Sequence, residues 1–120
     1  MHYPPPTPHN EAARLARLQM LEVLDTGPEP IFDALTRTAS LLCYVPIALL
    51  SLVDAERQWF KSNLGLEGTQ QTPREQAFCA HAILQSQVME VPDATLDPRF
   101  KDNPLVTGCL LYTSPSPRDL

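Results

Sequence analysis

The sequence predicts an α+β fold in which helices pack on a central antiparallel sheet. Two stretches before residue 45 repeat apolar side chains at helical spacing, which indicates amphipathic helices. An apolar run over residues 47–53 is then followed by a short polar segment and a second strand-like stretch over residues 58–64. With 120 residues, the chain is long enough for one domain with its own core. This order of elements favours helices packed on an antiparallel sheet.

The first helix is expected from Glu11 to Leu24, with Asn10 as its cap. Arg14 and Arg17 should face solvent. The apolar face consists of Leu15, Leu18, Leu21 and Leu24. This face can pack on the chain's own sheet or pair with the same helix of a second copy, because the stripe is too short to indicate a coiled coil.

The second helix is expected to start near Pro30 and to close before Pro46. Its apolar face should pack on the sheet. The residues of that face are Ile31, Leu35, Ala39 and Leu42.

The apolar run over residues 47–53 predicts an interior strand, the most buried of the chain, because it is apolar on both faces. Asp54 is expected in the turn of an antiparallel hairpin whose second strand covers residues 58–64. Trp59 and Phe60 must point to opposite faces of that strand. We therefore expect one of them in the core and the other towards solvent, a loop or a partner.

The segment after the loop over residues 65–71 has the pattern of a helix start. Thr72 would cap the helix, Pro73 would take its first position, and Glu75 would reach back to the cap. This third helix is expected to run to about Leu84.

Three shorter features are expected near the end of the chain. Residues 88–91 read as a short strand. Asp97 is expected to cap a helical turn around Arg99 and Phe100, and Asp93 to cap a local turn.

Composition excludes several classes of protein. With 14 acidic and 9 basic residues, the net charge of −5 disfavours nucleic-acid partners. No segment approaches the roughly 20 apolar residues that a transmembrane helix needs. Residues 1–10 are rich in proline and contain no apolar run, so we expect a disordered leader without a secretory signal, and a cytoplasmic protein. Cys43, Cys79 and Cys109 are too few and too widely spaced for a disulfide framework or a metal pair.

The last segment, residues 109–120, abandons the patterns that precede it. It resembles the translation of a transposase-type sequencing-library adapter. The native sequence is therefore expected to end near Gly108, and the preceding residues to belong to a longer gene product.

Eight short segments in order resemble the GAF domains at the front of bacterial signalling proteins. They are residues 21–26 (LEVLDT), 45–49 (VPIAL), 52–54 (LVD), 57–62 (RQWFKS), 72–75 (TPRE), 78–83 (FCAHAI), 91–94 (VPDA) and 97–100 (DPRF). The resemblance implies a partial GAF domain over residues 11–108, with a GAF/PAS-like central antiparallel sheet, helices packed on it and a pocket for a small-molecule ligand. It also implies a sensory role upstream of a histidine kinase or diguanylate cyclase, and a homodimer in the full-length protein.

Because strands that complete such a sheet would lie beyond Gly108, the central strand would expose unpaired backbone groups and apolar side chains. The isolated chain is therefore expected to be poorly soluble or molten. A cooperative thermal transition from monodisperse material would contradict this expectation.

The resemblance places the pocket between the sheet and the third helix, with Trp59, Phe78, Cys79 and His81 as candidate lining residues. Cys79 and His81 lie two positions apart on a helix and point about 200° away from each other, so they do not form an obvious nucleophile and base. We expect no catalytic residue, metal or cofactor in this part of the protein. Two alternatives remain open: a methionine sulfoxide reductase of the GAF type, which would need a second cysteine further along, and a dimerisation domain without a ligand.

Overall fold

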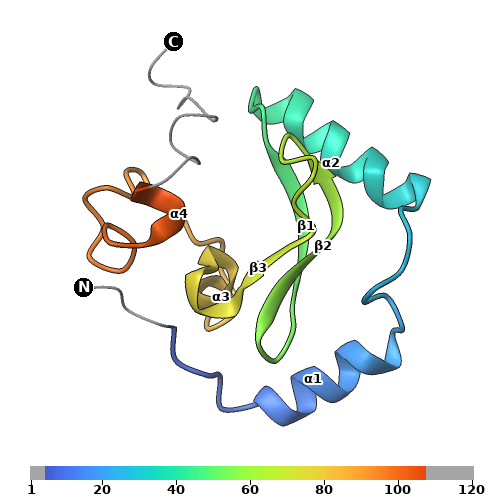
Figure 1. Cartoon of the computed structure of the whole chain (residues 1–120), viewed down its shortest axis with the longest axis horizontal. Coiled ribbons are helices and arrows are strands. Elements are labelled where there is room, and N and C mark those ends of the chain that lie inside the picture. Colours follow the sequence, from blue (N-terminus) through green and yellow to red (C-terminus); the bar gives the residue numbers. More distant parts are fainter. Residues whose placement is uncertain (1–4, 108–120) are drawn as a thin grey trace.

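The computed structural model describes residues 5–107 and confirms the α+β class (Figure 1). Its sheet has three antiparallel strands in the order β1-β2-β3. In Figure 1, α2 lies on one side of the sheet, α3 and α4 lie on the other, and α1 lies beside the β1–β2 turn. The elements in chain order are α1 (Glu11–Met20), α2 (Pro30–Cys43), β1 (Ala48–Val53), β2 (Arg57–Leu64), β3 (Gln71–Pro73), the 3₁₀ turn η1 (Arg74–Gln76), α3 (Phe78–Ala82) and α4 (Pro104–Thr107).

The predicted hairpin is confirmed. β1 and β2 pair antiparallel, and the amide of Asp54 donates to the carbonyl of Arg57 at 2.8 Å. The carboxylate of Asp54 accepts from the amide of Ala55 at 2.8 Å, as an Asp side chain in a turn commonly does. Local chemistry therefore sets this turn.

A β-bulge in the middle of β2 changes which side chains point to each face of the sheet. Ser51 pairs with Phe60, whereas the preceding residue, Leu50, pairs with Ser62, so Lys61 is an extra residue in the ladder. Side chains otherwise alternate between the two faces of a strand. Because of the bulge, Phe60 faces α3, whereas the next two side chains, Lys61 and Ser62, both face α2.

The prediction that the first strand is the most buried is wrong for the described residues. β1 is an edge strand with a single buried residue, Val53, whereas β2 is buried from Gln58 to Ser62. The reason is topological, because β2 has a neighbour on both sides within residues 5–107 and β1 has one. Trp59 and Phe60 do lie on opposite faces, but both are buried, which corrects the expectation that only one of them would be.

The first helix ends at Met20, four residues earlier than predicted. Glu22 adopts a left-handed conformation with φ 51°, which cannot continue a helix, and Leu18 is the buried residue of α1. Asn10 accepts from the amide of Arg14 through its backbone carbonyl and makes no capping bond with its side chain. Arg14 does not face solvent, since its guanidinium donates to the carbonyl of Val53 and thereby attaches α1 to β1.

The second helix starts at Pro30 as predicted but turns the opposite face to the sheet. Three residues of its predicted packing face, Ile31, Leu35 and Leu42, are exposed by 56–74%. The buried residue is Thr36, whose hydroxyl lies 2.9 Å from that of Ser62 on β2. Hydrogen bonds to the sheet, rather than the most apolar stripe, decide how α2 packs.

The predicted helix start at residues 72–75 is wrong. Thr72 lies in strand β3, opposite Gln58 of β2, and Pro73 lies opposite Arg57. Pro73 has no N–H to donate, which an edge strand tolerates. A 3₁₀ turn follows, and the helix proper, α3, begins only at Phe78.

The later segments are partly as expected. Residues 88–91 form no strand, and Val88 is 93% exposed. Asp97 does cap a turn, because its carboxylate accepts from the amide of Arg99 at 2.9 Å, and Asp93 accepts from the amide of Thr95 at 3.0 Å.

Asn103 ties the C-terminal turn to the rest of the fold. Its side chain donates to the carbonyl of Gln76 at 2.8 Å and accepts from the amide of Leu105 at 2.9 Å.

No helix within residues 5–107 has both the length and the apolar character to cross a membrane. The expected adapter-like tail, residues 109–120, lies outside the described residues, as do residues 1–4 of the leader.

Candidate functional site

A cavity of about 650 Å³ lies between the sheet and α3. This apolar cavity has the size of small-molecule sites in proteins, which are mostly lined by hydrophobic and aromatic side chains. Its lining residues are Ile47, Leu49, Ser51, Gln58, Phe60, Gly65, Leu66, Glu67, Thr69, Thr72, Phe78, Cys79 and Leu105.

The period of two along the strands builds the floor of the cavity. Leu49 and Ser51 of β1 alternate with side chains that face away from it, and Phe60 of β2 is the cross-strand partner of Ser51. Phe78 and Cys79 of α3 form the opposite wall, and Leu105 of α4 closes part of the rim. The hairpin of β1 and β2 therefore encloses one space together with α3 and α4, which follow later in the chain.

Gly65 shapes the mouth of the cavity. It has φ 102°, and a Cβ at this position would collide with the carbonyl oxygen of Pro46. Only glycine adopts this conformation without strain and permits so close an approach of two backbone segments. The position therefore brings the loop after β2 against the start of β1.

Of the four candidate residues from the sequence, the structure brings two to the cavity. Phe78 and Cys79 line it, whereas His81 and Trp59 do not. The ring of His81 instead meets Phe100 edge-on, with centroids 5.0 Å apart. Trp59 faces the other side of the sheet, where it lines a second cleft.

Phe100 links the cavity wall to the turn that follows Asp97. Its ring stacks on Phe78 with centroids 4.1 Å apart, and its side chain is fully buried. This stack holds the ring of Phe78 in place. Phe100 thus supports the α3 wall on the side that faces away from the cavity.

The thiol of Cys79 has no features of a nucleophile. Burial raises its pKa, and a hydrogen bond with Ser51 offsets this only in part. Because the thiolate is the reactive form, a raised pKa leaves the group less reactive. Cys43 is exposed at the end of α2 and lies outside the cavity.

Two polar features interrupt the apolar wall. The carboxamide of Gln58 donates to the hydroxyl of Thr72 at 3.1 Å, across the β2–β3 pair. At the mouth, Glu67 accepts from the amide of Gly65 at 3.0 Å, and this backbone bond is the main cause that lowers the pKa of Glu67. Glu67 therefore stays negatively charged at neutral pH.

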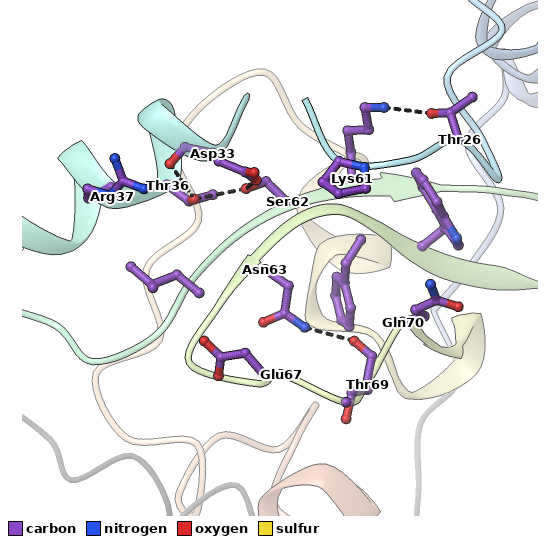
Figure 2. A pocket seen from close by; sticks show the side chains of 15 residues that line it. Thr26, Asp33, Thr36, Arg37, Lys61, Ser62, Asn63, Glu67, Thr69 and Gln70 are labelled. Atoms are coloured by element: carbon purple, nitrogen blue, oxygen red, sulfur yellow. Dashed lines mark hydrogen bonds between the residues drawn. The ribbon is translucent and has the colours of Figure 1, made fainter. Parts of the chain in front are cut away.

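The second cleft, of about 430 Å³, lies between α2 and β2 and is polar (Figure 2). Ser62 donates to Asp33 at 2.6 Å and contacts the hydroxyl of Thr36, as Figure 2 shows. Lys61 pairs with Glu29 at 2.7 Å and donates to Thr26, and its side chain is 1% exposed. These groups satisfy one another, so we assign this polar cleft to the attachment of α2 rather than to ligand binding.

Sequence reasoning missed most of the cavity floor. The alternation of Leu49 and Ser51 in the predicted hairpin contained the signal for β1. The sequence predicts Thr72 as a helix cap, so it does not predict the pairing of Thr72 with Gln58 across the sheet.

Within residues 5–107, no group of three or more His, Cys, Asp or Glu residues could hold a metal ion.

Comparison with known proteins gives one informative relationship. The chain is 47% identical over 104 residues to a cyclic di-GMP phosphodiesterase from Pseudomonas aeruginosa. The matched part is 87% of this chain but 18% of that enzyme, so the chain spans less than a fifth of its relative's length. No protein-family model matches the chain.

Proposed function

We propose that this chain is a GAF-type sensory module of a cytoplasmic signalling protein, and that it binds a small molecule in the apolar cavity. The observation that carries the proposal is the cavity itself, about 650 Å³ between the sheet and α3. The ordered sequence segments that resemble GAF domains, and helices on both sides of an antiparallel sheet, also support it.

The relationship to a cyclic di-GMP phosphodiesterase supports a role in cyclic di-GMP signalling. Because the match covers 18% of that enzyme, we assign ligand recognition to this chain and the reaction to a domain further along the full-length protein. We propose an enzyme of cyclic di-GMP turnover as that output. In this proposal the full-length protein forms a homodimer, which size measurement on that protein tests.

The alternative of a methionine sulfoxide reductase draws no support from Cys79. Cys79 is partly buried, its thiol is hydrogen-bonded to Ser51, and burial raises the pKa of the thiol. A reductase of this type needs a reactive thiolate. The cavity therefore favours binding over thiol chemistry.

The test is cyclic di-GMP hydrolysis by the full-length protein with the cavity filled. Leu49→Trp adds a large ring to the floor of the cavity and should act as a permanent ligand or a permanent block. We expect the rate of hydrolysis to change by several-fold and to lose its response to a low-molecular-weight extract of the native cells.

Leu96→Trp is the matched control, because Leu96 is 76% exposed and does not line the cavity. It should leave both the rate and the response to the extract unchanged. If Leu49→Trp behaves like Leu96→Trp in a protein that remains folded, the cavity is not a sensory site. A thermal midpoint of the full-length protein that no extract fraction shifts would favour the ligand-free dimerisation domain.

A further inference from the structure

The charge at the apolar cavity is negative. Glu67 is the charged side chain among the described residues that line it. The amide of Gly65 holds its carboxylate at the mouth and keeps it ionised. A ligand that carries phosphate groups would pass this carboxylate and leave water for an apolar wall, which is costly for an anion without a partner.

Three cations of the sheet and of the turn after it are engaged elsewhere. Arg57 forms two hydrogen bonds with Asp25, at 2.8 and 2.9 Å. Arg74 pairs with Glu11. Lys61 is buried against the opposite face of the sheet, beside Glu29. Each is held by a carboxylate and none lines the cavity.

Besides the bond between Ser51 and Cys79, the wall offers the neutral hydrogen-bonding pair of Gln58 and Thr72. The bond between Gln58 and Thr72 uses one N–H of the carboxamide and one lone pair of the hydroxyl. The carboxamide oxygen can still accept a hydrogen bond, and the hydroxyl proton can still be donated. Gln58 is 6% exposed, so this pair sits within the wall rather than at the rim.

Two aromatic rings face the same space. Phe60 contributes from β2 and Phe78 from α3, and Phe78 is supported by its stack on Phe100. Rings on two walls favour a flat ligand, since aromatic groups pack well in stacked or edge-on geometry.

From these features we infer that the cavity takes an uncharged, flat and mostly apolar molecule with one hydrogen-bonding group that pairs with Gln58 and Thr72. The cyclic dinucleotide that the relative's enzyme name gives as its substrate does not fit this cavity. This inference rests on the proposed sensory function and adds the chemical class of the ligand. The output enzyme would then respond to a molecule unrelated to its substrate.

The test compares two probes that differ in charge. 2-Naphthol is flat, uncharged and carries one hydroxyl, and 2-naphthyl phosphate is the same ring system with a phosphate. Binding to the full-length protein is followed by naphthyl fluorescence, and cyclic di-GMP is added as a competitor. We expect 2-naphthol to bind at least about tenfold more tightly than 2-naphthyl phosphate. The competitor should not displace it.

Three variants connect the result to the cavity. Leu49→Trp should abolish binding of 2-naphthol. Gln58→Leu should weaken it about three- to tenfold, as the loss of one neutral hydrogen bond does. The matched control is Gln70→Leu, because Gln70 is exposed and lines the polar cleft instead. Glu67→Gln should narrow the difference between the two probes by strengthening binding of 2-naphthyl phosphate.

The outcomes separate the two proposals. If 2-naphthyl phosphate or cyclic di-GMP binds as tightly as 2-naphthol and Leu49→Trp blocks it, the inference on ligand class fails while the sensory cavity stands. If neither probe binds, or Leu49→Trp leaves binding unchanged, the cavity is not a ligand site and the proposed function fails with the inference.

Discussion

Truncation of Phe100 should loosen α3 and the cavity wall together. Phe100 is fully buried, stacks on Phe78 and meets His81 edge-on, so it contacts two of the four candidate residues without lining the cavity. Removing such a ring costs about 3–5 kcal/mol through lost burial and the cavity that remains. Phe100→Leu keeps most of the volume and should cost less, about 1–2 kcal/mol, including the lost stacking of about 0.5–1.5 kcal/mol.

Hydrogen exchange measured by mass spectrometry on the full-length protein gives the assay, because it reports local stability without requiring one global transition. Amides of α3 should exchange about 10²–10⁴-fold faster in Phe100→Ala, the equivalent of about 3–5 kcal/mol. The control Leu96→Ala removes a side chain that is 76% exposed and should change exchange by less than about threefold. Equal exchange of α3 in the two variants would refute the supporting role of Phe100.

Two further predictions concern pH and the mouth of the cavity. Hydrogen bonds from Arg74 and Arg14 lower the pKa of Glu11 from 4.5 to about 2, so its ion pairs stabilise the docked α1 fully above pH 4.5. This contribution to stability should be lost as the pH falls from 4.5 to about 2. Hydrogen exchange of the α1 amides, measured against pH, should show this loss in the native protein and not in Glu11→Gln. Gly65→Ala forces a side chain onto a left-handed backbone and against Pro46. It should lower the free energy of opening of the hairpin, measured by hydrogen exchange of its amides, by about 1–3 kcal/mol. Gly27→Ala, where a Cβ meets nothing within 4 Å, is the control and should change little.

The sequence predicts the hairpin well because its determinants are local. Asp54 bonds the next amide whatever else the chain does, and the apolar run of β1 and the strand-like stretch of β2 pair directly with each other. The start of α2 at Pro30 is local in the same sense, because proline suits the first turn of a helix.

The orientation of α2 could not be predicted, because it depends on partners far along the chain. The apolar stripe with Leu35 and Leu42 is the natural choice for the packed face by periodicity alone. The structure instead buries Thr36 against Ser62, and this requires knowledge of the bulge that turns Ser62 towards the helix. A hydrogen bond between two residues 26 positions apart cannot be predicted from the periodicity of either segment alone.

Two of the four candidate residues from the sequence line the apolar cavity. Phe78 and Cys79 follow from the helix that the resemblance places beside the pocket. Thr72 has the chemistry of a helix cap and of a strand residue, and only its pairing with Gln58 decides between them. His81 is a candidate because its helix borders the expected pocket, but it lies two positions after Cys79, where the side chain points to another side of the helix.

The bulge at Lys61 makes the length of β2 as important as its composition. Without the bulge, strict alternation over the same residues would put Ser62 on the face of Phe60 and would turn every side chain after it to the other surface of the sheet. The hydroxyl that bonds Asp33 would then point into the apolar cavity, and α2 would lose its attachment. A deletion of Lys61 would instead remove the extra residue and keep Ser62 on the side of α2, but it would also remove the ammonium that pairs with Glu29. Elsewhere in β2, a single insertion or deletion should be excluded, because it would invert the faces that the bulge sets.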